Sequence, residues 1–75
     1  MRVLEQGQLK GDFEGFNDET TVFEFLSGSA WRQTRVQYWY HYAHMPRAKV
    51  FERDGRRYFQ VEGTDNTVEV VRVRR

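Results

Sequence analysis

The sequence has no cysteine in its 75 residues and only one proline, Pro46. The absence of cysteine excludes disulfide bonds and thiolate metal sites, and it permits a reducing compartment. No apolar run approaches the roughly 20 residues of a membrane helix, and residues 1–7 lack the apolar core of a signal peptide. We therefore expect a soluble, cytoplasmic protein that does not enter a membrane.

The chain also lacks a helical stripe, an internal repeat and a low-complexity tract, which predicts one domain over residues 1–75. A domain of this length buries only about 60% of its unfolded surface, so its margin of stability is small. Six phenylalanines, four tyrosines and two tryptophans are available to build the core. Stability must therefore come from buried aromatic rings or from a second subunit.

Charge is unevenly distributed along the chain. Residues 1–30 carry two basic and six acidic side chains, a balance of −4, whereas the remainder carries ten basic and five acidic side chains, a balance of +5. In one small domain the simplest meaning is attraction between neighbouring strands, and the second is head-to-tail association of molecules. Ten of the twelve cations are arginine, which favours bidentate and stacking contacts.

Period-two alternation predicts six extended segments bounded by turn residues or by proline. They are residues 8–16, 20–26, 30–45, 48–53, 56–62 and 67–73. Gly11 and Gly15 mark a bend or bulge in the first of them. Short antiparallel strands joined by tight turns hide their edges by curling, so we predict an all-β, small antiparallel, SH3-like open β-barrel of five or six strands.

Two hairpins have a register that can be written down. Asp54-Gly55 suits the positive φ angles of a type I′ turn, which places Phe51 opposite Tyr58. The core side of this hairpin is then Val50, Phe59 and Val61, and in the last segment Val68 and Val70 point inward.

The other hairpin turns at Ser27-Gly28. If that turn has two residues, Phe25 lies opposite Ala30 and Glu24 opposite Trp31. With this register, Phe23 and Phe25 form the core face of their strand.

The segment of residues 30–45 is longer than an ordinary strand and must bend sharply or break. Its second half places Tyr38, Tyr40 and Tyr42 on one side and Trp39 and His41 on the other. The sequence does not decide which side is buried. Pro46 ends the segment because proline cannot donate to a ladder.

Residues 11–16 (GDFEGF), residues 21–33 (TVFEFLSGSAWRQ) and the alternating tyrosines up to Pro46 resemble a family of short uncharacterised bacterial β-barrel domains, of the kind also found among integron gene-cassette products. The most specific part is the hairpin Gly28-x-x-Trp31-x-Gln33, although relatives usually show Asn-Gly where this chain has Ser27-Gly28. The resemblance implies a barrel fold and no particular activity.

Catalytic and metal-binding patterns are scarce. His41 and His44 fall on opposite faces of a strand, so they do not share a metal ion. The acidic residues near the turns lack a partner at catalytic spacing; they are Glu14, Asp18, Glu19 and Glu24. No nucleophile elbow or phosphate-binding loop is present. We therefore assign no catalytic residue, no metal ligand and no cofactor.

Two alternatives remain open besides a role in protein interaction. One is an enzyme whose site forms by oligomerisation, since Val36-Gln37-Tyr38 loosely resembles the pore-lining strand of the plasmid-borne type II dihydrofolate reductases. The other is a barrel that binds single-stranded nucleic acid, because aromatic rings alternate with arginines. Arg32 and Arg35 precede the tyrosines, and Arg53 and Arg56 accompany Phe51 and Tyr58.

The preferred hypothesis is a protein-interaction module, most simply one that self-associates, in which exposed aromatic side chains contact the partner. The predicted interaction residues are Tyr38, Trp39, Tyr40, Tyr42, Phe51, Tyr58, Arg53 and Arg56. Trp31 and Gln33 are the candidates for an enclosed ligand pocket.

Overall fold

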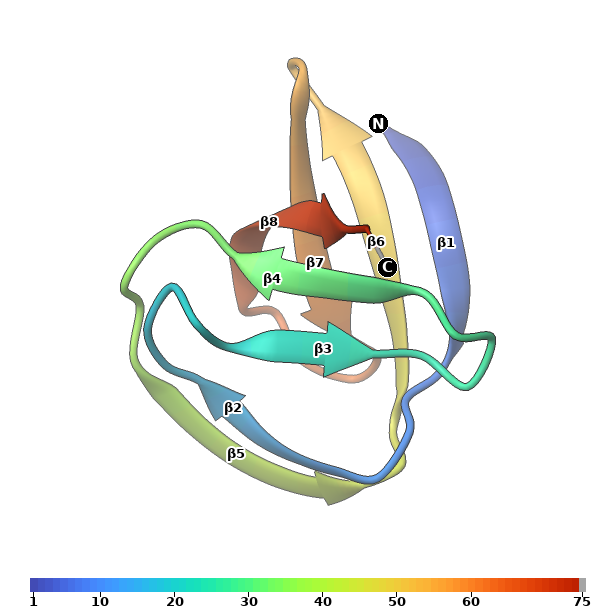
Figure 1. The fold of residues 1–75 in the computed structure, drawn as a ribbon, viewed down its shortest axis with the longest axis vertical. Helices are drawn as coiled ribbons and strands as arrows, with labels where there is room; N and C mark the ends of the chain where they lie inside the picture. The colour runs from blue at the N-terminus through green and yellow to red at the C-terminus, as the bar shows by residue number, and fades with distance from the viewer. Residues whose placement is uncertain (75) are drawn as a thin grey trace.

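The computed structural model describes residues 1–74, which form eight antiparallel strands and no helix (Figure 1). The strands are β1 (Arg2–Gln8), β2 (Asp12–Phe16), β3 (Val22–Glu24), β4 (Ala30–Gln33), β5 (Trp39–His44), β6 (Arg47–Arg53), β7 (Arg56–Val61) and β8 (Thr67–Val73). Six of them make one sheet in the order β1-β6-β7-β8-β4-β3, and β2 pairs with β5 in a second sheet. The prediction of an all-β chain is confirmed.

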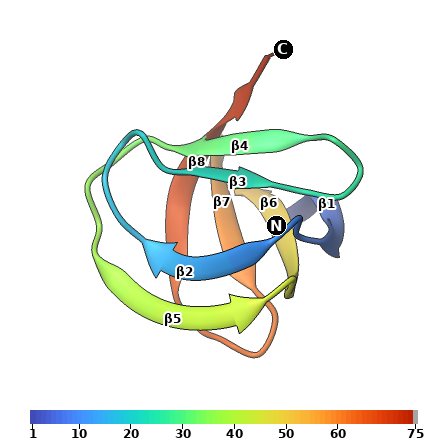
Figure 2. The same cartoon turned by 60° about the horizontal axis from the view of Figure 1, so that its bottom comes forward.

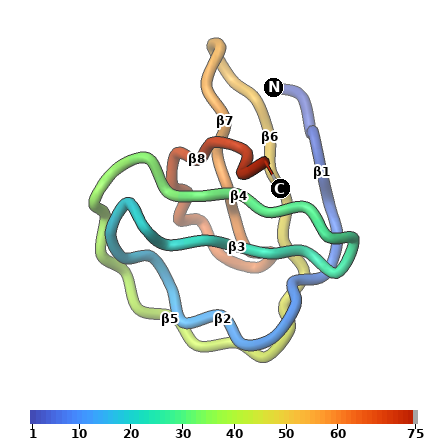
Figure 3. Tube along the Cα trace, in the orientation of Figure 1, coloured from blue at the N-terminus to red at the C-terminus, as the bar shows by residue number. Residues whose placement is uncertain are grey.

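The two sheets join at a corner where β1 leads into β2 and β5 leads into β6 (Figure 3). Leu9 N donates to Pro46 O at 2.8 Å, and Met45 N donates to Gly11 O at 3.0 Å. Met45 adopts a φ of 45°, a left-handed conformation that lets the chain turn directly before Pro46. These contacts carry the ladder around the corner, so both sheets wrap the same core.

The other edge of the larger sheet, at β3, also reaches this corner. Leu9 forms an isolated bridge with Phe25, and Leu26 N donates to Gln8 O at 2.9 Å. The strand β8 bends in the middle: its first half pairs with β7 and its second half pairs with β4. The sheet therefore curls enough to bring both of its ends to the turn between β1 and β2 (Figure 2).

Phenylalanine rings fill the core. Phe23 lies flat against Phe59, with ring centroids 4.1 Å apart and an interplanar angle of 4°. Phe13 and Phe16 pack around this pair from β2. Burying one such ring contributes about 2 to 3 kcal/mol. The predicted core residues are confirmed as buried: Phe23, Phe25, Val50, Phe59, Val61, Val68 and Val70.

The β6–β7 hairpin has the predicted register. Asp54 and Gly55 have φ angles of 55° and 78°, as a type I′ turn requires. Phe51 pairs with Tyr58 and Val50 with Phe59. This hairpin was predictable because the turn type alone sets the pairing of the strands it joins.

The register predicted for the β3–β4 hairpin is wrong by one residue. Phe23 pairs with Trp31 and Glu24 with Ala30, because Phe25 N donates to Ser29 O at 2.8 Å and three residues form the loop. Gly28 has a φ of 100°, the position at which a three-residue loop needs glycine. Phe23 and Phe25 remain on the core face because the alternation within their own strand is unchanged.

Residues 30–45 do not form one strand, since β4 ends at Gln33 and β5 begins at Trp39. The Gln33 side chain is completely buried and holds the connection: Nε2 donates to the carbonyls of Asn17 and Arg35, and Oε1 accepts from Asn17 N. The segment was predicted either to bend sharply or to break, and it breaks. The break sends β5 into the second sheet.

The structure has eight strands, more than the five or six expected. Besides the break between β4 and β5, the sequence did not predict β1, and the strand expected over residues 8–16 begins only at Asp12. The pairing of β1 with β6 shifts between Val3 and Glu5. A bulge of this kind destroys period-two alternation, which was the signal used to find strands.

Candidate protein-interaction face

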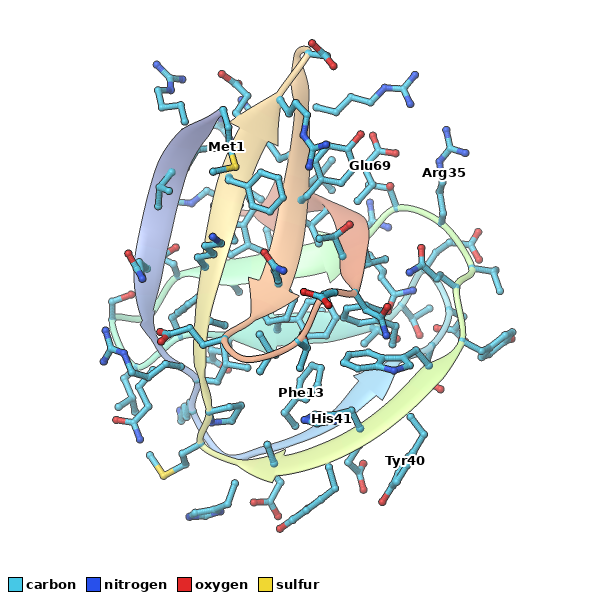
Figure 4. The ribbon with its side chains drawn as sticks, turned by 180° about the vertical axis from the view of Figure 1, so that it is seen from behind. Met1, Phe13, Arg35, Tyr40, His41 and Glu69 are labelled. Atoms are coloured by element: carbon cyan, nitrogen blue, oxygen red, sulfur yellow. The ribbon has the colours of Figure 1, made fainter. Side chains whose placement is uncertain are left out.

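Tyr40 and Tyr42 on β5, together with Tyr38 directly before this strand, form an exposed strip, which we call the tyrosine face. Their exposed fractions are 74%, 76% and 53%. Tyr40 points away from the body of the molecule, whereas His41 and Phe13 lie on its inner side (Figure 4). The predicted alternation of β5 is therefore present, and the phenol side is the outer one.

The inner side of β5 packs on the core. The Trp39 ring lies 4.9 Å from Phe16 and 6.3 Å from Phe13, centroid to centroid, and stacks on His41 at 5.1 Å. Of the predicted interaction residues, Trp39 thus lies on the opposite face of the strand from the tyrosines. Its ring fixes β5 to the hydrophobic core.

A close approach of β2 holds β5 in this position. Gly15 pairs with Tyr40 at a φ of 112°, and a Cβ atom on Gly15 would lie 1.9 Å from the carbonyl oxygen of Trp39. No other residue fits there, because this φ and this contact both exclude a side chain. The pairing shifts between Phe13 and Gly15, as predicted for a bulge, and Glu14 between them is exposed.

Two carboxylates accompany the tyrosines on the outer side. Asp12 Oδ1 lies 2.6 Å from His44 Nδ1. The charge of Asp12, followed by burial and a hydrogen bond to Asp12, raises the pKa of the Tyr42 phenol above its ordinary value of 10.0; the charge of Glu14 acts in the same direction. The tyrosine face is therefore an acidic aromatic surface.

A shallow hollow of about 300 Å³ opens beside Tyr38 and Tyr40. Its walls are Glu14, Phe16, Asn17, Tyr38, Trp39 and Tyr40. Aromatic rings next to a carboxylate attract a guanidinium or ammonium group, because the ring faces and the carboxylate all carry negative electrostatic potential. The chemistry of the hollow therefore suits a cationic side chain.

The other predicted interaction residues lie on the β6–β7 hairpin, apart from the tyrosine face. Phe51 is only 1% exposed, so it offers no ring to a partner. The Arg53 guanidinium lies 5.4 Å from the Phe51 centroid and 5.7 Å from that of Tyr58, and Lys49 Nζ lies 5.7 Å from Phe51. The alternation predicted that Phe51 lies on the side of the hairpin away from the core. Phe51 lies on that side, but neighbouring side chains such as Arg53 and Lys49 cover its ring.

The two predicted pocket residues do not share a site. Trp31 is buried, its Nε1 donates to Glu5 Oε1 at 2.9 Å, and it borders an open groove that β8 and the loop after β3 also line. Gln33 lies away from this groove, and its amide is fully used in the hydrogen bonds to Asn17 and Arg35. Gln33 therefore has a structural role.

The arginines that precede the tyrosines in sequence are engaged elsewhere. Arg32 Nη1 donates to the carbonyl of Glu19, and Arg35 Nε forms an ion pair with Glu69 Oε1 at 3.1 Å (Figure 4). Gln37 Nε2 donates to Thr67 O at 2.8 Å, and Val36 to Tyr38 precede β5 in place of forming a strand. Of the cations predicted to accompany the tyrosines, Arg32 therefore contacts Glu19 and Arg35 contacts Glu69.

The sequence reasoning did not select Asp12 and Glu14 as members of the site. Their outward direction was available from the alternation around Phe13, but the pairing of β2 with β5 was not, since it joins segments more than twenty residues apart. His41 and His44 lie on opposite faces, as predicted.

Within residues 1–74, no cluster of three or more His, Cys, Asp or Glu residues has the geometry to hold a metal ion. The same part of the chain contains no helix long and apolar enough to cross a membrane. Comparison of the chain with protein-family models, curated proteins and solved structures gives no match.

Proposed function

We propose that this chain is a non-enzymatic protein-interaction module that binds its partner through the tyrosine face. One observation carries this proposal: Trp39 packs against the core on the inner side of β5, while Tyr38, Tyr40 and Tyr42 on the outer side are each more than half exposed. Tyrosine is enriched at protein interfaces because its ring supplies apolar contact area and its hydroxyl bonds at the wet rim. An exposed aromatic strip of this kind is available for contact with a partner.

The proposal includes the architecture. We propose that the curled sheets are an SH3-like open barrel, which the bridge between Leu9 and Phe25 supports by linking β3 to the end of β1. The kinship with short bacterial barrels and integron-cassette products belongs to the same proposal, on the strength of the hairpin motif and the alternating tyrosines.

The two carboxylates beside the tyrosines determine which partner is favoured. Asp12 and Glu14 make the electrostatic potential near the phenols more negative, so a cationic protein segment is attracted there and a phosphate backbone is repelled. This makes single-stranded nucleic acid the weaker candidate for the tyrosine face. Arginine suits the hollow better than lysine, since a planar guanidinium stacks on a ring and binds a carboxylate at the same time.

The test is a titration of the isotope-labelled protein with a hexa-arginine peptide, followed by NMR. We expect shifts at residues 38–42 and at Glu14, and a weaker response to hexa-lysine. Tyr40→Ala should weaken binding about fivefold, which corresponds to about 1 kcal/mol for one exposed cation–π contact.

Val22→Ala serves as the matched control, because Val22 is an exposed apolar side chain on β3 away from the tyrosine face. The proposal fails if hexa-arginine shifts no resonance of the tyrosine face, or if Tyr40→Ala and Val22→Ala bind equally well.

A further inference from the structure

We infer that the partner of the tyrosine face is the tip of the β6–β7 hairpin, residues 53–56, of a second copy of this chain, so that molecules associate head to tail. The inference rests on the proposed function, because it names the partner for the same surface. It follows from the positions of two surfaces, from the charges on them and from the groups that have no ion-pair partner among residues 1–74 of the same molecule.

The two surfaces lie at opposite ends of the molecule. Along the longest axis, which measures 30 Å, the β6–β7 turn is at one end and the β2–β5 pair is at the other (Figure 1). Tyr40 points out of the β5 end (Figure 4). The hairpin tip therefore cannot fold back onto the tyrosine face of its own chain, and only another molecule can bring the two together.

The charges of the two surfaces are complementary. Arg53 and Arg56 flank the turn, with Lys49 further along β6, against the single carboxylate of Asp54 at the tip itself. Asp12 and Glu14 flank the tyrosines. Within residues 1–74, neither Arg56 nor Glu14 forms an ion pair.

The hollow beside Glu14 supplies the contact that Arg56 lacks. Within its own chain, Arg53 already lies over the rings of Phe51 and Tyr58, whereas Arg56 makes no comparable contact in the described part of the chain. A guanidinium placed in the hollow would meet the carboxylate of Glu14 and the rings of Tyr38 and Tyr40 together. Arg56 is therefore the anchor of the inferred contact.

Electrostatics also disfavours the symmetric alternatives. Two tyrosine faces in contact would bring Asp12 and Glu14 of both molecules together, and two hairpin tips would bring their arginines together; like charges in contact are costly. Head-to-tail contact joins opposite charges instead. Such a heterologous interface leaves one free surface at each end, so association continues into chains unless the rotation closes a ring.

The experiment uses two variants that each remove one side of the contact without reversing its charge. The tip variant carries Arg53→Gln and Arg56→Gln, and the face variant carries Glu14→Gln and Tyr40→Ala. We expect the wild type to gain mass with concentration in light scattering, less so at high salt, and each variant alone to remain a monomer.

Mixing the two variants gives the decisive result. The tip variant supplies an intact tyrosine face and the face variant supplies an intact tip, so one molecule of each can associate. The other two surfaces of that pair are both disrupted, so we expect a species of two chains and nothing larger. Arg74→Gln is the control for the loss of an exposed arginine elsewhere, and it should associate like the wild type. Monomers only in the mixture would overturn the inference. Association of either variant by itself would also overturn it and would indicate a symmetric contact between two faces or two tips.

A second measurement does not depend on the folding of these variants. Because the chain has no cysteine, Arg57→Cys offers one position for a spin label beside the tip. Mixed with isotope-labelled wild type, the label should broaden the amide signals of residues 38–42. Broadening only at the partner's hairpin tip overturns the inference. So does a wild type that stays monomeric while hexa-arginine still binds the tyrosine face, and in that case the proposed function stands.

Discussion

The two sides of the segment from Tyr38 to Tyr42 differ in what they contact, although their residues alternate along the chain. On the inner side Trp39 and His41 stack on each other and pack against the phenylalanines of β2. On the outer side Tyr38, Tyr40 and Tyr42 project into solvent beside two carboxylates. The difference shows that aromatic content alone does not identify a core, because the rings on one side of this strand pack on phenylalanines and those on the other side are exposed.

The substitution expected to have the largest effect is at Gly15, because it displaces β5 as a whole and so disturbs both of its sides. In Gly15→Ala the new Cβ would meet the carbonyl oxygen of Trp39 at 1.9 Å, at a φ that alanine avoids. We expect a loss of roughly 3 to 5 kcal/mol in the free energy of unfolding. Urea denaturation measures it. Gly7→Ala is the matched control: its Cβ would lie 3.8 Å from Phe25, an ordinary contact, so an equal loss there would contradict the explanation.

Trp39→Ala separates the inner side from the outer. Removal of the half-buried indole takes away its contacts with Phe13 and Phe16, so we expect a loss of roughly 2 kcal/mol. Thermal and urea unfolding give the value. The β-sheet spectrum should persist, because the central ring pair of Phe23 and Phe59 is untouched. A stability equal to that of the wild type would show that Trp39 does not belong to the core.

Tyr40→Ala is the counterpart on the outer side. Its phenol is three-quarters exposed, so we expect the free energy of unfolding to change by less than about 0.5 kcal/mol. The same unfolding measurements apply. Together with Trp39→Ala it forms a direct comparison of adjacent residues: if both variants lose similar stability, the division of β5 into a packing side and a recognition side is incorrect.

The smallest expected effect concerns the titration of Tyr42. Because Asp12 raises the pKa of this phenol in the folded state, folded chains keep the proton at a pH where unfolded chains lose it. The resulting stability is present below about pH 10 and is lost as the pH rises through the raised pKa. Asp12→Asn should bring the pKa back toward its ordinary value, as followed by ultraviolet absorbance or NMR. Asp65→Asn, on an exposed turn, should leave it unchanged.

The hairpins show how far local sequence determines the fold. The register of β6–β7 follows from Asp54-Gly55, because both turn residues must adopt positive φ and only one strand pairing is compatible with that turn. The β3–β4 loop uses Gly28 in a different turn, one residue longer, and two-residue and three-residue loops with a single glycine are not distinguished by sequence.

The candidate site was predictable in part. The alternation of tyrosines along β5 was readable from period two, since it depends only on the geometry of one strand. The acidic neighbours were not, because their place beside Tyr42 depends on the pairing of β2 with β5. Phe51 and Gln33 could not be placed either: the first is covered by side chains of its own hairpin, and the second is buried by the turn at Asn17.

The sequence by itself determined which residues alternate within each strand, which phenylalanines and valines face the core, and where the tight β6–β7 turn falls. Those properties arise from the stereochemistry of a few adjacent residues. Only the tertiary structure decided that the chain breaks after Gln33, that β5 leaves the larger sheet and that its phenols face outward. Those outcomes depend on hydrogen bonds and ring contacts between distant segments, such as Gln33 with Asn17 and Trp39 with Phe16.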